Sequence, residues 1–337
     1  MTSSAADAAP RPGTVPGKPV KRWRLASWAP LLVRILLCGV TATINPTSLS
    51  YATFVRLCQA AMIPLVLGLG ATFIILMGSI DLSVEGVLTL SAVILSVLVL
   101  NGANGNDFGI FGIAIVLCVG ACDGFVNSVL NDRLKVPSFM TTLGTWFIGV
   151  GVGNAILGGT AVRINDPMIR ALAIERDPVA GLPWGVWVAI LCLLIALVIQ
   201  NYTRLGRYIY ALGGGEDLAA LSGIPAARVR IMTFTLAGVF YAVGGVLAAA
   251  QLGLGNAQIG NGRLFTTVTA VVVGGTSLIG GQGSVLQTLV GVMIVVTLSN
   301  GMVLMGIPPS VQIGVNGLMI IVAVALSIDR KRMRIVK

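Results

Sequence analysis

Long apolar runs, separated by short polar segments, constrain the fold of this chain more than any other feature. Of its 337 residues, 56% are hydrophobic and only 10% are charged, and the mean hydropathy is +0.94. Soluble domains contain far fewer apolar runs that are long enough to cross a bilayer. The sequence therefore predicts an all-α, polytopic membrane protein.

Ten runs are each close to the length of a bilayer core. The first covers residues 28–44, follows a basic flank, and is interpreted as an uncleaved span rather than a signal peptide. The transmembrane domain is expected over 28–328, between a disordered tail (1–27) and a basic tail (329–337). The other nine spans are expected at 58–78, 83–100, 109–130, 139–158, 186–202, 231–252, 266–280, 284–304 and 310–328.

The positive charges predict the orientation of these spans. With the N-terminus inside, sixteen of the 22 Lys and Arg residues lie in cytoplasmic segments, five lie outside, and Arg34 lies within the first span. Cytoplasmic segments of membrane proteins carry the excess of Lys and Arg. Both termini are therefore predicted to be cytoplasmic. The net charge of +10 reflects this topology, so nucleic-acid binding is not expected.

The longest cytoplasmic loop, residues 203–230, is a polar island between apolar runs. It contains four arginines together with Glu216 and Asp217. Within it, the string EDLAALSG places the acids in a first helical turn and Gly223 at the end, with Pro225 shortly after. This pattern predicts a short cytoplasmic helix that contacts a partner.

The longest outer loop, residues 159–185, carries mixed charges and ends at two tryptophans typical of a membrane interface. The charges fit either a solvated loop or a docking surface for an external protein. The candidates for such docking are Arg163, Arg170 and Arg176.

Enzyme chemistry finds no support in the sequence. There is no His, and the glycine-rich stretch 274–283 is not followed by the Gly-Lys-Ser/Thr of a phosphate-binding loop. The five cysteines lie in or beside apolar runs without metal-like pairs, and we interpret them as small buried side chains. No catalytic residue, metal site or cofactor is expected in this chain.

The segment 78–86, GSIDLSVEG, interrupts a stretch that is otherwise apolar. Asp81 is expected to cap the following helix by accepting a hydrogen bond from the N–H of Ser83 or Val84. The segment is either a break inside the membrane, beside protein or a water-filled cavity, or an ordinary turn at the cytoplasmic face.

Acids and neutral polar side chains inside the spans suggest a solute path. Glu85 and Asp123 are candidates for ion, proton or substrate contacts, because acids inside membranes are usually functional. Neutral hydrogen-bonding groups suit an uncharged polyhydroxylated solute, although bonds between helices explain many of them equally well. The substrate-path candidates are Asp81, Ser83, Asn127, Thr142, Thr145, Trp146 and Asn300.

Four segments resemble, in order, the membrane permeases of bacterial ABC importers for ribose, xylose, galactose and arabinose. They are GSIDLSVEG (78–86), VPSFMTTLGT (136–145), TRLGRYIYALGGGEDLAALSGI (203–224) and VVGGTSLIGGQGSVLQTLVGVMIVVTLSNGMVLMGI (272–307). The resemblance covers almost everything after residue 57.

The resemblance implies a multi-pass protein of the inner (plasma) membrane with several partners. Such permeases are usually homodimers in membrane lipid, and a cytoplasmic helix docks into a separate ATPase that binds ATP and Mg²⁺. A periplasmic or lipid-anchored sugar-binding protein delivers the solute. By resemblance, the ATPase-coupling residues are Gly214, Gly215, Glu216, Asp217, Ala220, Ser222 and Gly223.

Several residues depart from the family pattern. Such permeases commonly have a glycine at the position of Glu85, an apolar residue at Asp123, and a Glu-Leu-Asp string at 264–266, which here is Leu-Phe-Thr. Asp217 and Leu218 replace two alanines. These departures leave the identity of the solute open.

We therefore expect a permease subunit of an ABC importer that moves a neutral monosaccharide or polyol by alternating access. Two alternatives remain. One is the related importer type for branched-chain amino acids or nucleosides, and the other is an ion-coupled carrier that uses the membrane acids.

Overall fold

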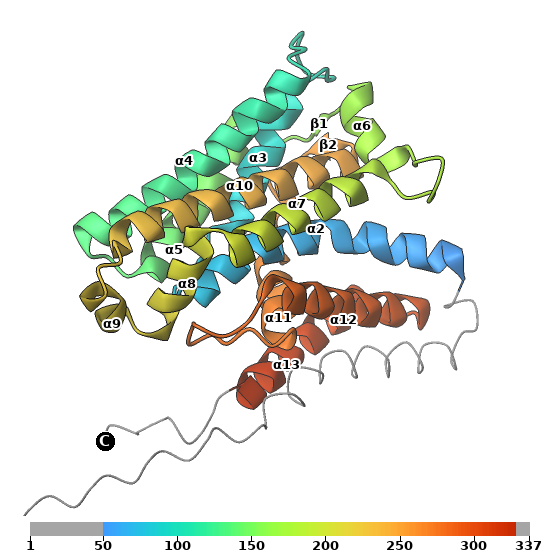
Figure 1. Ribbon diagram of the computed structural model, residues 1–337. Helices are drawn as coiled ribbons and strands as arrows, with labels where there is room; N and C mark the ends of the chain where they lie inside the picture. The colour runs from blue at the N-terminus through green and yellow to red at the C-terminus, as the bar shows by residue number, and fades with distance from the viewer. Residues whose placement is uncertain (1–49, 328–337) are drawn as a thin grey trace, which may run out of the picture.

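The computed structural model describes residues 50–327, and in this range the chain is mostly helical (Figure 1). The expected span 28–44 and the tails 1–27 and 329–337 lie outside the described residues. Six described helices are long and apolar enough to cross a membrane, which confirms the helical membrane fold. They are α2 (Tyr51–Leu76), α4 (Ile110–Leu134), α5 (Ser138–Leu157), α7 (Trp184–Tyr202), α10 (Ala226–Leu252) and α12 (Val285–Leu304).

Shorter elements complete the described part of the chain. Two of the helices are apolar but short, namely α3 (Val84–Leu98) and α11 (Arg263–Val273). Strands β1 (Val162–Arg163) and β2 (Leu254–Gly255) form an antiparallel pair. The remaining helices are α6 (Pro167–Ile174), α8 (Arg204–Gly214), α9 (Glu216–Leu221) and α13 (Pro309–Ser327).

Each of the nine spans expected after residue 57 contains a helix, but several boundaries differ from the hydropathy prediction. Helix α2 begins seven residues early because the Ser50 side chain caps it by accepting from the backbone N–H of Thr53. Helix α4 continues to Leu134, through polar residues that hydropathy assigned to a loop. Helix α11 ends at Val273, where the glycine-rich stretch begins.

Helix α10 is the central helix of the fold and packs against α2, α3 and α4. Glycines let α4 and α10 approach with their backbones in contact. A Cβ atom added at Gly124 would lie 2.1 Å from the carbonyl oxygen of Phe234, and one added at Gly120 would lie 2.3 Å from that of Gly238. This spacing is the small-xxx-small packing typical of membrane helices.

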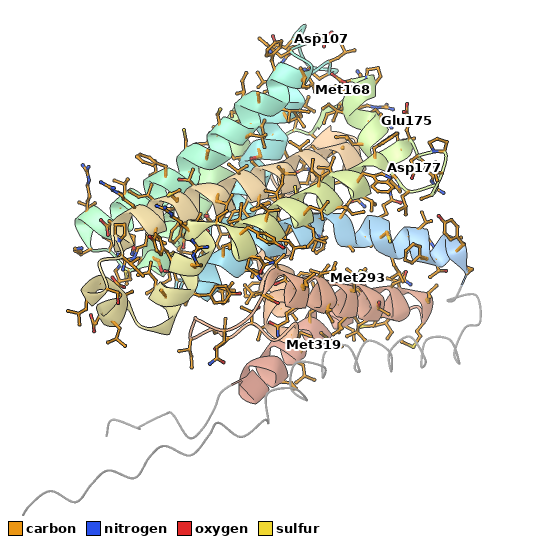
Figure 2. The ribbon with its side chains drawn as sticks, viewed as in Figure 1. Asp107, Met168, Glu175, Asp177, Met293 and Met319 are labelled. Carbon is orange, nitrogen blue, oxygen red and sulfur yellow. The ribbon has the colours of Figure 1, made fainter. Side chains whose placement is uncertain are left out.

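The two ends of the helix bundle carry different polar elements. Helices α8 and α9 lie at one end, whereas α6, β1 and β2 lie at the other (Figure 1). The side chains of Asp107, Glu175 and Asp177 lie at the second end (Figure 2). This separation agrees with the predicted placement of 203–230 and 159–185 on opposite sides of the membrane.

The outer segment 159–185 is an ordered cap. Asp177 accepts hydrogen bonds from the backbone N–H groups of Val179, Ala180 and Leu182, and from the indole N–H of Trp187. These bonds hold the pKa of Asp177 below its usual value, with the bond from Ala180 contributing most.

The expectation that the cysteines are buried is wrong for Cys118 and Cys122. Cys192 is buried, but these two are exposed on α4. They lie in a groove whose remaining lining is Phe108, Phe111, Ala114, Ile115 and Val119. A surface of this composition on a spanning helix is suited to lipid or to another apolar helix.

Candidate functional site

The break before α3 is satisfied by side chains of α5. The backbone N–H of Ile80 donates to Ser138 Oγ at 3.3 Å, and that of Leu82 donates to Thr142 Oγ1 at 3.0 Å. Asp81 Oδ1 accepts from the N–H of Ser83 at 2.8 Å and from its hydroxyl at 2.6 Å, as the sequence predicted. Backbone groups freed by the break are therefore paired with protein, as a membrane interior requires.

The segment 78–86 starts at the end of the bundle that carries α8, since a Cβ added at Gly78 would lie 3.9 Å from Gly213 Cα. Asp123 of α4 lies beside Ser83 and within electrostatic range of Asp81. Asp132, at the cytoplasmic end of the same helix, is about 13 Å further along the axis, given a rise of 1.5 Å per residue. The segment therefore runs from that end of the bundle to the level of Asp123.

Five of the seven substrate-path candidates belong to one buried network, which includes Asp123. The Asn127 amide donates to Asp123 Oδ2 at 2.8 Å, and Thr145 Oγ1 donates to Asn127 Oδ1 at 2.9 Å. No salt bridge neutralises Asp81 or Asp123 within residues 50–327. The five candidates, each at most 8% exposed, are Asp81, Ser83, Asn127, Thr142 and Thr145.

The other two candidates lie apart from this network. Trp146 is half-buried and packs against the backbone of Gly86, where an added Cβ would lie 2.6 Å from the Trp146 Cα. Its ring stacks on Phe147 with centroids 5.5 Å apart. Asn300 is half-buried on α12.

Glu85 joins α3 to the start of α11. Its carboxylate accepts from the backbone N–H of Leu264 at 2.9 Å and is 3% exposed. The residue at the N-cap of α11 is Gly262, which has no side chain with which to cap the helix. Glu85 therefore caps α11 from a neighbouring helix.

Arg263 was placed in an outer turn by the charge count, but it begins α11 near Glu85. The guanidinium is within electrostatic range of this carboxylate and is half-buried. The opposite charges of the two side chains compensate one another at this position.

The short helix predicted from EDLAALSG is confirmed as α9. Gly223 follows it with a positive φ of 77°, and the N–H of Ile224 bonds back to the carbonyl of Ala219. Ala219 is buried against the bundle, whereas Leu218 and Leu221 are 70% and 86% exposed.

The structure places six of the seven predicted coupling residues on the exposed surface; Gly215 is half-buried. Leu218 and Leu221, which lie within the same segment but are not among the seven coupling residues named from the sequence, are exposed beside them. The sequence did carry a signal for their shared exposure, because two leucines three residues apart in a short polar helix lie on one face.

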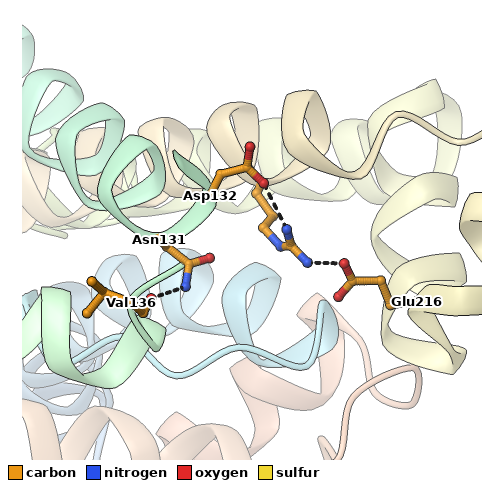
Figure 3. A network of polar contacts seen from close by, with 5 residues as sticks. Asn131, Asp132, Val136 and Glu216 are labelled. Atoms are coloured by element: carbon orange, nitrogen blue, oxygen red, sulfur yellow. Dashed lines mark hydrogen bonds and ion pairs between the residues drawn. The ribbon is translucent and has the colours of Figure 1, made fainter. Parts of the chain in front are cut away.

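An arginine bridge holds α9 in place. Arg230 of α10 donates to Asp132 Oδ1 at 3.0 Å and also bonds Glu216 (Figure 3). The bridge joins the ends of α4, α9 and α10. At the tip of α4, Asn131 donates to the carbonyl of Val136 at 2.7 Å and so closes the turn into α5 (Figure 3).

Glycines join the end of α8 to the end of α2. A Cβ added at Gly213 would lie 1.9 Å from the carbonyl oxygen of Leu76, which already accepts from the N–H of Gly281 at 2.9 Å. The Tyr210 hydroxyl donates to the carbonyl of Gly283 at 2.7 Å. The end of α8 therefore packs directly on the end of α2, just before the segment 78–86.

The three outer arginines differ in accessibility. Arg163 in β1 and Arg176 after α6 are exposed. Arg170 is half-buried, and an added Cβ at Gly253 would lie 3.1 Å from its Nη1 atom. Two of the three candidates are thus available to an external protein.

Comparison with known proteins places these features in a family. The family model described as branched-chain amino acid transport system / permease component matches residues 53–324. The ribose import permease protein RbsC of Escherichia coli K12 is 31% identical over 316 residues, covering 93% of this chain and 96% of the relative. The fructose import permease protein FrcC of Rhizobium meliloti is 32% identical over 307 residues, covering 88% and 84%.

A third relative is the L-arabinose transport system permease protein AraH of Escherichia coli K12. It is 32% identical over 278 residues, which cover 82% of this chain and 83% of the relative. No solved structure matches the chain. The chain therefore belongs to the branched-chain amino acid transport system / permease component family, as a multi-pass transport protein of the inner membrane.

Proposed function

We propose that this chain is the membrane-spanning subunit of an ABC importer for a neutral monosaccharide or polyol. The relatives named for ribose, fructose and arabinose import support a sugar over an amino acid or nucleoside. The neutral polar groups inside the bundle are consistent with an uncharged solute.

The observation that carries the coupling role is the exposure of α9. Two exposed leucines on one face of this six-residue helix offer an apolar contact to a partner protein. A separate ATPase, carrying its own ATP and Mg²⁺, is the partner that this family requires. Closure of the ATPase would displace α9 and α8. The contact of Gly213 with Leu76 would then move the end of α2 and the adjoining segment 78–86.

The complete subunit is proposed to have ten spans, with both termini in the cytoplasm, and to work as a homodimer. An 11-residue helix is only about 16 Å long, so α11 crosses the membrane only together with the segment before it. The buried network around Asp81 and Asp123 would form the wall behind the solute path in this conformation, and Trp146 and Asn300 would flank it.

A periplasmic or lipid-anchored binding protein is proposed to dock on the outer cap. Arg163 and Arg176 are exposed there, and Arg170 lies beneath them. Reversal of the exposed charges should weaken docking most at low salt, because such charges are screened over about 10 Å at 0.1 M ionic strength. A loss of docking that does not depend on salt would contradict this role.

The test of the coupling role replaces residues 214–223 by a Gly-Ser linker of equal length. In a pull-down with the cognate ATPase from detergent, the wild-type chain should retain the ATPase and the linker variant should not. A matched variant that replaces residues 102–107 of the outer loop controls for general damage. Retention of the ATPase by the linker variant would reject the assignment.

Uptake experiments separate the alternatives. Accumulation of labelled ribose, fructose or arabinose that requires ATP supports the proposal. Accumulation of leucine or a nucleoside instead would indicate the related importer type. Uptake that needs no ATPase and is abolished by ionophores would indicate an ion-coupled carrier.

A further inference from the structure

The chain between α10 and α11 re-enters the membrane alongside α3. A Cβ added at Gly255 would lie 2.0 Å from Ser96 Oγ, and one added at Gly260 would lie 2.6 Å from the carbonyl oxygen of Glu85. The rise from Glu85 to Ser96 along α3 is about 16 Å. The segment 253–262 therefore descends through roughly half of a hydrocarbon core.

The side chains of this segment alternate between two environments. Gln258 and Asn261 are exposed and Asn256 is half-buried. The buried members, which face the bundle, are Gly253, Gly255, Ala257, Ile259 and Gly260. Leu254 is also half-buried and Gly262 is exposed, so the outward side forms a strip of three amides only between residues 256 and 261.

Two of these amides hold each other in position. The side-chain amide of Asn261 donates to Gln258 Oε1, and Asn256 Oδ1 accepts from the N–H of Gln258 at 2.7 Å. Within the described residues, Gln258 Nε2 and Asn261 Oδ1 make no hydrogen bond, so a donor and an acceptor remain free.

Exposure of these groups at this depth has a physical consequence. Amides that face lipid lose their hydrogen bonds to water, and irregular backbone is found at membrane depth only beside protein or a water-filled cavity. Gln258 and Asn261 are exposed within the structure of residues 50–327, which favours a water-filled cavity over protein as their environment.

The chemistry of the strip favours an uncharged solute. Arg263, at its inner end, lies near the carboxylate of Glu85, which compensates its charge. Phe265, in the first turn of α11, is 60% exposed. Paired amides with an aromatic ring nearby can bind the hydroxyl groups and the apolar face of one solute.

We propose that Asn256, Gln258 and Asn261 are solute-binding residues of the translocation path and take an uncharged, polyhydroxylated solute. The inference rests on the proposed import function for the identity of the solute, but not for the aqueous exposure of the strip. The two parts are tested separately.

Thiol labelling tests the aqueous exposure. Gln258→Cys and Asn261→Cys are introduced singly, and a charged, membrane-impermeant methanethiosulfonate is applied to proteoliposomes opened by freezing and thawing. Asn106→Cys in the exposed outer loop is the positive control. The native Cys118 and Cys122 are the negative control, since both are exposed but lie in an apolar groove.

The strip cysteines should react within about tenfold of the Asn106→Cys rate, and the native pair should be at least about 100-fold slower, because charged reagents do not enter lipid. Labelling of both strip cysteines at the rate of the native pair would overturn the inference.

Transport tests the contact with solute. Gln258→Leu and Asn261→Leu should each reduce ATP-driven uptake of labelled ribose, fructose or arabinose by about five- to tenfold, the effect of one lost hydrogen bond. ATP hydrolysis stimulated by the binding protein should persist, and Asn106→Leu should transport normally. Normal uptake by both strip variants would reject solute contact and leave the import function intact. If the wild-type protein moves no sugar, the import function fails, and labelling still decides the exposure of the strip.

Discussion

The bridge from Arg230 to Glu216 makes a prediction about the stability of α9. Glu216 and Asp217 both lie in the first turn of this helix, so the helix dipole acts on both. Of these two acids, only Glu216 forms an ion pair within residues 50–327, and its side chain is 56% exposed while that of Arg230 is 17% exposed. A pair of this exposure contributes about 1 kcal/mol at most.

The perturbation is Glu216→Gln, with Asp217→Asn as the matched control. Loss of about 1 kcal/mol of stabilisation should make local opening of α9 about fivefold more frequent, since about 1.4 kcal/mol changes an equilibrium constant tenfold. Hydrogen exchange followed by mass spectrometry on peptides covering 214–224 measures this opening. Exchange should accelerate by about two- to fivefold in Glu216→Gln and less in Asp217→Asn, which loses only the dipole interaction.

A double-mutant cycle with Arg230→Gln completes the test. In the Arg230→Gln background, the two acid substitutions should have the same small effect. Equal acceleration of exchange by Glu216→Gln and Asp217→Asn in the wild-type background would show that the bridge does not stabilise α9.

Three further predictions concern the packing and the outer cap. Glu85→Ala should destabilise the protein by about 1–3 kcal/mol, since the buried N–H of Leu264 loses its acceptor, and Glu85→Gln should recover most of this in a thermal unfolding assay. Gly124→Val should lower the unfolding temperature or the yield of folded protein, because its Cβ meets the Phe234 carbonyl and overpacking costs about 1–3 kcal/mol; Gly105→Val in the open outer loop should not. Because its pKa is lowered in the folded protein, ionised Asp177 stabilises the cap at any pH above the ordinary Asp pKa of about 3.9. This stabilisation is lost as the pH falls through the lower pKa of the folded state. Tryptophan emission should therefore change only below about pH 4.

The spans and α9 were predictable because each depends on local sequence. Bilayer-length apolar runs identified the helices between residues 58 and 328, and the acids, Gly223 and Pro225 marked both ends of α9. The bond between Asp81 and Ser83 was also predictable, because its partners are two residues apart.

Other features depend on contacts between distant residues. The bond of Glu85 to Leu264 joins residues 179 positions apart, so no local pattern contains it. The re-entrant segment was missed because hydropathy treated its glycines and amides as an outer turn. Its alternation of small or apolar residues with amides from 255 to 259 was the available signal, and it has meaning only beside α3.

The exposure of Cys118 and Cys122 was also beyond local reasoning. All faces of an apolar helix have similar hydropathy, so hydropathy alone does not show which face is buried. Packing against neighbouring helices decides which face is covered. Helix α4 uses Gly120 and Gly124 against α10, which leaves the two thiols on the outer side.

The central claim is that ATP hydrolysis on a partner drives sugar through this chain. The most direct measurement is uptake of labelled ribose, fructose and arabinose by proteoliposomes that contain the chain, its ATPase and its binding protein, with and without ATP. We expect accumulation of at least one sugar that requires ATP and all three proteins and that survives ionophores. Accumulation that persists without ATP, or none of these sugars accumulating in the complete system, would contradict it.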